Sequence, residues 1–292
     1  MPSSAELLRP VLIVNPYASR VDEELVRAVE EVLRPVATLR TERRGHATEL
    51  AASADGEAVV VLGGDGVANE VLNGLPPDVA LGVLPAGGTS VLARALGLPR
   101  DPIAAARRIG VGGRRRITVG RVNGRRFGFA ASVGVDAAAV RRVDELGRSR
   151  EGRRPGDVAF ALAVIRTLPQ FREPVLEVAG RGRAAFALVG NGDPYTYVGR
   201  LALHVMPQSR FELGLDVIAP TRLRIRRIPR YVRYVLMGRG QERDPELVYG
   251  HDLDTLEIAC DRPLPLQADG EDLGDVARVV FEAERAAIDV LV

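Results

Sequence analysis

Short apolar runs alternate with segments of helical periodicity along the first 110 residues. Strands are expected at 11–14, 36–39, 58–62 and 79–84, and helices at 22–33, 48–54, 67–72, 91–96 and 101–109. In the segment 22–33, apolar residues recur every three or four positions, and Asp22 stands where an N-cap is expected. Because the strands are apolar throughout and alternate with helices, they indicate a parallel sheet covered on both faces.

The pattern changes after the glycine-rich stretch at 110–113. Asn123-Gly124 separates two expected strands, 114–122 and 125–132, and is a strong hairpin signal. One helix is expected at 157–168, and further strands at 174–179, 184–191, 215–219, 255–260 and 276–282. A length of 292 residues suits two domains. We therefore predict an α/β domain at 1–115 and a mostly antiparallel β domain at 116–282.

Composition narrows the class of protein. The formal net charge is only +2, which does not indicate a nucleic-acid-binding protein, and all 40 basic residues are arginine. Cys260 is the one cysteine, which rules out an internal disulfide and fits a reducing cytoplasm. The N-terminus lacks a signal-peptide pattern, and no apolar run reaches the roughly 18 residues of a spanning helix. We expect a cytoplasmic protein that meets a membrane only at its inner surface.

Three loops follow predicted parallel strands, at 15–20, 63–69 and 85–90. In open α/β sheets, ligands bind at this edge. Glycines 63, 64 and 66 would let backbone N–H groups approach an anion and would allow positive φ angles. Asp65 would hold Mg²⁺ or order the loop around a nucleotide. A single glycine-rich turn is more often free of ligand, but three on one sheet edge favour a nucleotide site. The loop is not a P-loop, because Gly-Lys-Ser/Thr is absent.

The loops also carry a family resemblance. The string 63–71, GGDGVANEV, resembles the GGDGTxNEV motif of the diacylglycerol-kinase-type lipid kinases, which include bacterial diacylglycerol kinases and sphingosine and ceramide kinases. Asn15-Pro16 is similar to the start of their NPxSG motif, and 84–97 to their third nucleotide loop. Asp269-Gly270-Glu271 resembles their late DGE motif, and 191–199 resembles the actinobacterial branch. GGDG alone also occurs in NAD kinases and phosphofructokinases; together with DGE it is more specific.

The resemblance implies a Rossmann-like nucleotide domain followed by an antiparallel β-sandwich that offers a lipid hydroxyl to ATP. It suggests that residues 283–292 return to the first domain and that the protein forms a homodimer. It implies an ATP site with Mg²⁺ at Asp65, formed by Asn15, Pro16, Ser19, Thr41, Gly63, Gly64, Asp65, Gly66, Asn69, Gly87, Gly88 and Thr89.

This chain departs from the family pattern at four places. Val67 replaces a threonine, Arg20 stands where the family has glycine, and the loop at 88–91 lacks the usual Asn and Asp. Leu213 stands where an aspartate usually helps to bind a structural Mg²⁺. These departures bear on nucleotide affinity and on the structural metal.

Phosphoryl transfer needs a base for the attacking hydroxyl, and Asp269 and Glu271 are the candidates. In an extended chain, both side chains would project from the same face. Taken alone, Asp-Gly-Glu is a common hairpin composition. The resemblance assigns both carboxylates to catalysis and leaves open which one is the base.

The segment 221–239 interleaves arginines with apolar residues and two tyrosines. Such a mixture suits an anionic membrane surface, and it equally suits an ordinary solvated helix. The apolar helix at 159–165 would line a lipid cleft or, more simply, belong to the core. We predict an ATP- and Mg²⁺-dependent lipid kinase. The alternatives are an NAD kinase-like enzyme with a water-soluble acceptor, or a catalytically weak relative that binds nucleotide or lipid for regulation.

Overall fold

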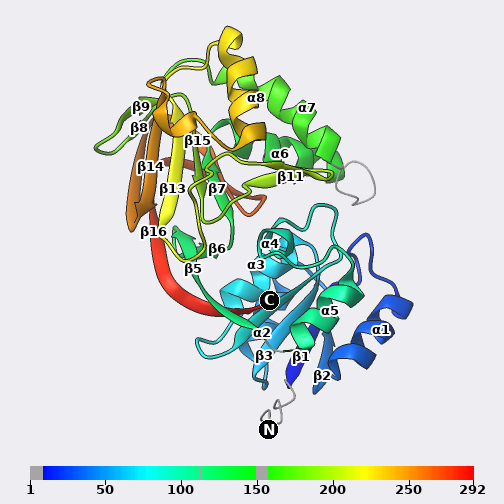
Figure 1. The fold of residues 1–292 in the computed structure, drawn as a ribbon. Coiled ribbons are helices and arrows are strands. Elements are labelled where there is room, and N and C mark those ends of the chain that lie inside the picture. The colour runs from blue at the N-terminus through cyan, green and yellow to red at the C-terminus, as the bar shows by residue number, and fades with distance from the viewer. Residues whose placement is uncertain (1–8, 112, 149–156) are drawn as a thin grey trace. The chain divides into compact units, whose positions relative to one another are not determined.

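The computed structural model describes residues 9–111, 113–148 and 157–292, and the chain divides into two compact units (Figure 1). Unit 1 comprises Met1–Ile117 together with Ala286–Val292, and unit 2 comprises Thr118–Arg285. Sequence analysis placed these two boundaries after residues 115 and 282. The predicted fold class, an α/β domain followed by a β-sandwich domain, is confirmed.

Unit 1 is built on a parallel sheet. Its strands are β1 (Pro10–Val14), β2 (Ala37–Arg40), β3 (Ala58–Gly63) and β4 (Ala80–Pro85), in the order β2-β1-β3-β4. The end of β16 (Glu271–Leu291) adds a further parallel strand, in which Val290 pairs with Leu81. Strands β1, β3 and β4 are buried along their whole length, as their unbroken apolar runs predict.

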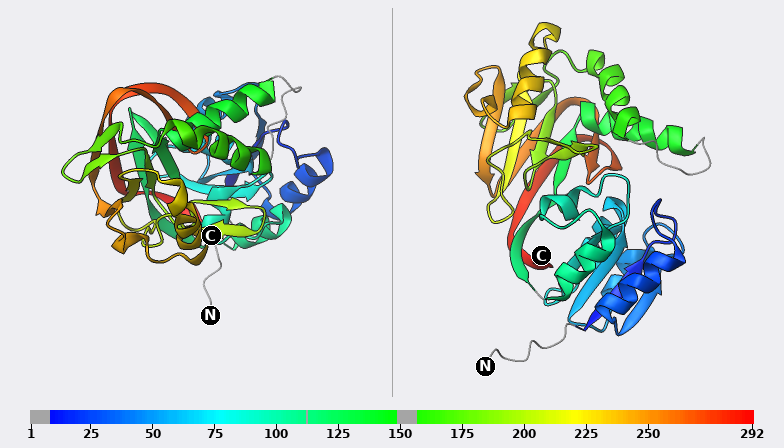
Figure 2. Two further views of the ribbon diagram at one scale, coloured as in Figure 1. Left: turned by 90° about the horizontal axis from the view of Figure 1, so that it is seen from above. Right: turned by 45° about the vertical axis from the view of Figure 1, so that its right-hand side comes forward.

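Helices cover both faces of this sheet (Figure 2). Helix α1 (Glu23–Leu33) packs against α5 (Pro102–Gly110), and α2 (His46–Ala52) packs against α3 (Asp65–Gly74). The short α4 (Val91–Ala95) follows β4. The predicted cap is present, because the Asp22 side chain accepts a hydrogen bond of 2.8 Å from the Leu25 amide.

The strand order places a switch point beside β1. The chain runs from β1 to β2 on one side and then to β3 on the other. Ligands of open α/β sheets bind outside the carboxyl ends of the strands at such a point. The loops that follow β1 and β3 therefore occupy the position in unit 1 where a nucleotide is expected.

Unit 2 is mainly antiparallel. Its remaining strands are β5 (Arg114–Val122), β6 (Arg125–Phe127), β7 (Ala130–Val133), β8 (Leu176–Val178), β9 (Gly182–Ala184), β10 (Ala187–Gly190), β11 (Thr196–Val198), β12 (Leu201–Leu203), β13 (Leu215–Pro220), β14 (Leu247–Leu253) and β15 (Thr255–Ala268). Its helices are α6 (Val135–Arg148), α7 (Asp157–Thr167) and α8 (Ile228–Met237), with short 3₁₀ turns η1 (Leu168–Gln170), η2 (Ile225–Arg227) and η3 (Gln241–Arg243). Strand β15 pairs with β8 through its first half and with β7 through its second.

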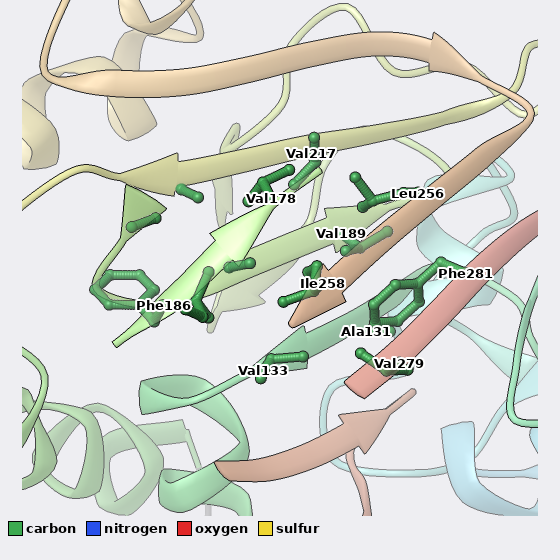
Figure 3. Close-up of a cluster of buried hydrophobic side chains, with 14 of the residues drawn as sticks. Ala131, Val133, Val178, Phe186, Val189, Val217, Leu256, Ile258, Val279 and Phe281 are labelled. Carbon is green, nitrogen blue, oxygen red and sulfur yellow. The ribbon is translucent and has the colours of Figure 1, made fainter. Parts of the chain in front are cut away.

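The sandwich core lies between these strands (Figure 3). Val133, Val189 and Val217 enter it from β7, β10 and β13, and Ile258 and Phe281 enter it from β15 and β16. Because neighbouring residues of a strand point to opposite faces, Ser132, Leu188 and Ile218 face the other side of the same sheet. Helices α6 and α8 cover that second face.

Unit 2 differs from the sequence-based expectation in one interrupted strand and in several unexpected elements. The strand expected at 125–132 is two strands, β6 and β7, interrupted at Gly128 and Phe129. Helix α6 was not expected, and neither were strands β9, β11, β12 and β14. The hairpin at Asn123-Gly124 is present, with φ angles of 49° and 79° that match a type I′ turn. Among the described residues, no helix combines the length and the apolar character needed to cross a membrane.

Candidate functional site

The three loops predicted to bind nucleotide are joined by backbone hydrogen bonds in unit 1. The Asn15 amide donates to the Leu62 carbonyl at 3.0 Å, and the Ala86 amide donates to the Gly63 carbonyl at 2.9 Å. The Arg20 amide donates to the Ala86 carbonyl at 3.3 Å. The loops after β1, β3 and β4 therefore form one connected edge, as the strand pattern predicts.

Glycines shape this edge by close backbone approach. A Cβ atom on Gly87 would lie 2.5 Å from the Gly64 Cα, and a Cβ on Gly63 would lie 2.3 Å from a Val67 methyl group. The positive φ angles that glycines 63, 64 and 66 would allow are not used, because none of the three has one, and Gly64 has φ of −100°. Gly64 and Gly87 are therefore needed where two loops pack backbone to backbone, and Gly63 is needed where the Val67 side chain packs on the loop.

Asp65 orders the third loop. Its two carboxylate oxygens accept hydrogen bonds from the Val91 amide at 3.0 Å and the Leu92 amide at 3.1 Å, at the start of α4. This is one of the two roles expected for Asp65. Its role as a Mg²⁺ ligand stays a prediction, and no cluster of three or more metal-binding side chains occurs among the residues that the structure describes. One carboxylate suits Mg²⁺ that is held largely by nucleotide phosphates.

Two features make this edge fit a phosphate group. Helix α3 begins at Asp65 and has glycine, Gly64, at its N-cap, so no side chain caps its first turn and its positive dipole end faces this edge. The Ser90 hydroxyl is buried without a hydrogen-bond partner. A buried donor of this kind is costly unless a ligand or water satisfies it. Both groups belong to loops that the sequence assigned to nucleotide binding.

The remaining nucleotide-site residues lie at the same edge or beside it. Thr41 follows β2, is buried, and donates its amide to the Val14 carbonyl at 2.9 Å. Asn69 is buried in α3. Pro16 and Ser19 are exposed in the first loop, and Gly88 and Thr89 lie in the third, Gly88 exposed and Thr89 half-buried. Glu70 of α3 accepts from the Ala47 amide in the first turn of α2 at 3.2 Å, and its negative charge complements that helix N-terminus.

The DGE motif forms a tight turn in unit 2. Asp269 and Gly270 have φ angles of 47° and 79° and connect β15 to β16, with Ala268 paired to Glu271. The expectation of an extended chain with both carboxylates on one face is therefore wrong. Asp-Gly is a favoured pair for a two-residue hairpin turn, since both positions need positive φ.

Asp269 is held by the backbone of the β6–β7 connection. Its Oδ2 accepts from the Gly128 amide at 2.6 Å, and its Oδ1 accepts from the Phe129 and Ala130 amides at 3.0 and 3.1 Å. The residue is 3% exposed. These bonds explain why the strand expected at 125–132 is interrupted, since three of its amides turn toward one carboxylate.

Glu271 has a different environment. Its Oε2 accepts a hydrogen bond of 2.5 Å from Arg125 of β6, and its side chain is 6% exposed while that of Arg125 is 34% exposed. A partly exposed arginine side chain can rotate, whereas backbone amides cannot. Of the two carboxylates, Glu271 is therefore the one that a conformational adjustment can release.

The structure adds a third carboxylate that sequence analysis did not single out. Asp136 of α6 accepts hydrogen bonds at 2.9–3.0 Å from the Ser132 hydroxyl, the Tyr195 hydroxyl and the Gln267 amide. Gln267 in turn accepts from the Gly270 amide at 2.9 Å, which links Asp136 to the DGE turn. Burial raises the pKa of Asp136 above its usual value, and the three hydrogen bonds partly oppose that shift.

An apolar cavity of about 120 Å³ lies in unit 2 between α8 and the sheet. Its wall includes Leu188 of β10 and Ile218 of β13, and Tyr231, Tyr234 and Val235 of α8. It was not foreseen, because no sequence signal states which strands become neighbours. The apolar segment 159–165 was suggested to line a lipid cleft or to belong to the core. Its Ala163 is buried, whereas Leu162 and Ile165 are exposed. None of these three residues lines the cavity.

The cavity and Asp136 are connected by one row of the sheet. Gln267 pairs with Ser132, Ser132 with Leu188, and Leu188 with Ile218. Directly paired residues share a face and lie about 5 Å apart across the strands. The same face thus changes from polar, beside Asp136 and the DGE turn, to apolar, at the cavity, within about 15 Å.

Next to Leu213, where the family resemblance implies a structural metal, two carboxylates contact an arginine and a backbone amide. Arg285 donates to Asp254 at 2.5 Å and pairs with Asp252 at 2.8 Å, and Asp252 also accepts from the Gly214 amide at 2.7 Å. Leu213 supplies no carboxylate here. The residues present therefore fit a guanidinium cation rather than a second Mg²⁺.

Comparison with known proteins agrees with this geometry. Residues 9–122 match the diacylglycerol kinase catalytic domain, and residues 130–292 match the YegS C-terminal NAD kinase beta sandwich-like domain. The chain is 26% identical over 245 residues to a diacylglycerol kinase of Bacillus subtilis (strain 168), covering 77% of this chain and 75% of that protein. It is 26% identical over 286 residues to a diacylglycerol kinase of Staphylococcus carnosus (strain TM300), covering 90% of this chain and 88% of that protein.

Solved structures share the fold. A diacylglycerol kinase of Bacillus anthracis str. Sterne superposes with a TM-score of 0.71 at 19% identity, over 98% of this chain and 97% of that chain. A second solved chain from the same strain has a TM-score of 0.78 at 22% identity, over 100% of this chain and 98% of that chain. The two-domain architecture is thus common to these proteins.

Proposed function

The chain belongs to the family that joins a diacylglycerol kinase catalytic domain to a YegS C-terminal domain, and on that premise we propose that it transfers the γ-phosphate of ATP to a hydroxyl of diacylglycerol or a related lipid. Membership of a kinase family supports a phosphotransferase. The lipid acceptor, the use of ATP and the need for Mg²⁺ are the finer parts of the proposal, and each is supported by particular residues.

One observation carries the choice of a lipid acceptor: the row of the unit 2 sheet that runs from Gln267 through Ser132 and Leu188 to Ile218. It offers carboxylate and amide groups at one end and an apolar cavity at the other. A molecule with a hydroxyl group and a hydrocarbon tail matches this gradient, because the tail gains about 0.8 kcal/mol for each buried CH₂ group.

Three side chains receive distinct roles in this proposal. Glu271 acts as the base that accepts the proton of the attacking hydroxyl, since its ion-pair partner Arg125 is a partly exposed side chain that can move. Asp269 positions the turn that carries Glu271, because its oxygens accept from three backbone amides. Asp136 accepts a hydrogen bond from the acceptor and orients it, in place of one of its present donors.

The nucleotide loops of unit 1 serve the donor. The N-terminus of α3 and the close approach of Gly64 to Gly87 let phosphate oxygens come near the backbone at the positive end of a helix dipole. Asp65 would hold Mg²⁺ with those phosphates, and the ion, when bound, neutralises charge that develops on the transferred group. Val67, which replaces the family threonine, is buried against Gly63, so it contributes packing there rather than a hydroxyl group.

The main alternative is a kinase of a water-soluble acceptor. The cavity disfavours a water-soluble acceptor, because its wall is formed by apolar and aromatic side chains, with Gln241 as the exception. A catalytically weak relative is the second alternative. Against that reading, Asp65, Asp269 and Glu271 are all present and each is held in a defined geometry.

The test is transfer of labelled phosphate from ATP in the presence of Mg²⁺. The acceptors are detergent-dispersed diacylglycerol, ceramide, sphingosine and monoacylglycerol, with NAD as the water-soluble comparison. Glu271→Gln should lower kcat by about 100-fold or more, and the matched control Glu257→Gln, on a half-exposed carboxylate paired with Arg278, should not. Phosphorylation of NAD alone, or full activity of Glu271→Gln, would contradict the proposal.

A further inference from the structure

Helix α8 has apolar residues on two opposite faces. Tyr231, Tyr234 and Val235 point inward and line the cavity. The exposed positions of the helix recur at 229, 232, 233, 236 and 237, which is the spacing of a single helical stripe. Together with flanking arginines, the stripe forms what we call the outer face of α8, consisting of Val232, Leu236, Met237, Arg226, Arg233 and Arg239.

The apolar part of the outer face is well exposed. Val232, Leu236 and Met237 are 50%, 44% and 56% exposed. The β11–β12 hairpin continues this character next to the helix, because Val198 and Leu201 are also exposed and the His204 amide donates to the Val235 carbonyl at 2.8 Å. Large exposed apolar side chains that gather on one surface mark a site of interaction.

The arginines of this region fall into two sets. Arg224, Arg227 and Arg230 pair with Glu246, and Arg230 also pairs with Asp244, so most of their charge is compensated within the fold. Arg226, Arg233 and Arg239 are exposed and form no ion pair with any carboxylate that the structure describes. Arg233 lies 5.9 Å from the centre of the Tyr234 ring. The outer face therefore combines apolar side chains with uncompensated positive charge.

We propose that the outer face of α8 is a docking surface for an anionic lipid bilayer. Apolar side chains of such a helix enter the boundary between headgroups and acyl chains, while the flanking arginines contact lipid phosphates. The inference rests on the proposed function, because a lipid acceptor is what requires the protein to meet a membrane.

Charge decides between a bilayer and a second copy of the chain. The outer face carries three arginines and no acidic residue. A symmetric dimer across this face would place like charges opposite one another, which is unfavourable. An anionic bilayer complements the same charge, and the homodimer expected from the family resemblance would have to use another surface.

The position of the helix also links docking to the acceptor. The side chains of α8 that face inward line the cavity, so one helix of about 10 Å diameter separates the docked surface from the space proposed for the lipid tail. A bilayer on the outer face would bring acceptor molecules next to that space.

The test is co-sedimentation of the full-length protein with vesicles of phosphatidylcholine, either pure or with one-third phosphatidylglycerol. We compare the wild type with Arg226→Gln/Arg233→Gln/Arg239→Gln. The matched control, Arg100→Gln/Arg107→Gln/Arg262→Gln, removes three exposed arginines elsewhere. Since each arginine near an anionic surface contributes roughly a fivefold factor, the outer-face variant should bind anionic vesicles about 100-fold more weakly, and the control should bind like the wild type.

A second variant, Leu236→Gln/Met237→Gln, probes the apolar contribution and should also weaken binding. Thermal unfolding of each variant shows that the fold is retained. The proposal would be overturned if the two arginine variants lost equal affinity for anionic vesicles, or if the wild type bound neutral and anionic vesicles equally. Binding to neither vesicle type would point to an acidic protein partner instead.

Phosphorylation of a short-chain diacylglycerol, dissolved as monomers, separates this inference from the proposed function. The outer-face variant should keep wild-type turnover of that acceptor and lose turnover of diacylglycerol in anionic vesicles. If no variant and no wild-type sample phosphorylates any lipid, while vesicle binding still depends on the three arginines, the kinase proposal fails and the docking surface stands.

Discussion

Replacement of Asp269 by asparagine separates a positioning role from a catalytic one. Asparagine tolerates the φ angle of 47° at this position, so the change removes only the negative charge and one acceptor atom. In the best orientation its carbonyl oxygen keeps the bonds to the Phe129 and Ala130 amides, and its NH₂ group then faces the Gly128 amide at a distance now 2.6 Å.

The magnitude follows from that geometry. One charge-assisted hydrogen bond is lost and one buried donor is left without a partner, at a combined cost of about 3 kcal/mol. Because 1.4 kcal/mol corresponds to a factor of ten, local opening of the β6–β7 connection should become about 100-fold more frequent.

Hydrogen exchange followed by mass spectrometry measures this opening directly. Peptides covering 128–130 should lose protection in Asp269→Asn, while those of unit 1 should not change. Asp254→Asn is the matched control, since that carboxylate is exposed and its ion pair with Arg285 contributes less than about 1 kcal/mol. If Asp269→Asn keeps wild-type protection at 128–130 yet abolishes phosphate transfer, Asp269 takes part in the chemistry and the positioning argument is wrong.

Three further predictions test other parts of the account. Gly87→Ala should weaken ATP binding, measured by calorimetry, by tenfold or more, because its methyl group would lie 2.5 Å from the Gly64 Cα. The control Gly110→Ala, outside the nucleotide site, meets only a Leu33 methyl group at 4.0 Å and should bind ATP normally. Burial raises the pKa of Cys260 to about 11, so its reaction with a thiol reagent at pH 8 should be more than 100-fold slower than in the protein unfolded by guanidinium; equal rates would refute the shift. Burial also raises the pKa of Asp136 above its usual 3.8, so the contribution of this group to stability is largest below that pH and is lost as the pH rises through the raised value. The free energy of unfolding of Asp136→Asn, measured relative to the wild type, should therefore increase between pH 4 and pH 7, and a constant difference would contradict this.

Much of unit 1 could be predicted from the sequence because its signals are local. Strands such as 58–63 are continuous apolar runs whose burial on both faces follows from that pattern. The three loops could be placed together because the carboxyl ends of parallel strands share one edge. The resemblance of GGDG and DGE to known motifs indicated the family from the sequence alone, without any knowledge of contacts between residues in the structure.

The site in unit 2 depends on contacts that the sequence does not state. The pairing of Ser132 with both Gln267 and Leu188 joins segments more than 50 residues apart. That register creates both the gradient across the sheet and the environment of Asp136. The geometry of Asp269 also escaped prediction, because its three donors lie about 140 residues earlier in the chain. The composition Asp-Gly-Glu correctly indicates a hairpin turn, whereas the assumption of an extended chain at this motif was wrong.

The most direct test of the lipid-kinase account is the dependence of phosphate transfer on acyl chain length. The measurement is kcat/KM for a series of diacylglycerols, from short to long chains, with the wild type, with Ile218→Phe and with the surface control Val280→Phe. The account predicts that the wild type prefers longer chains, and that filling the cavity at Ile218 lowers kcat/KM for them by about tenfold or more, with a smaller effect on the shortest acceptor. A wild type indifferent to chain length, or an Ile218→Phe variant with unchanged preference, would contradict the assignment of the cavity to the lipid tail.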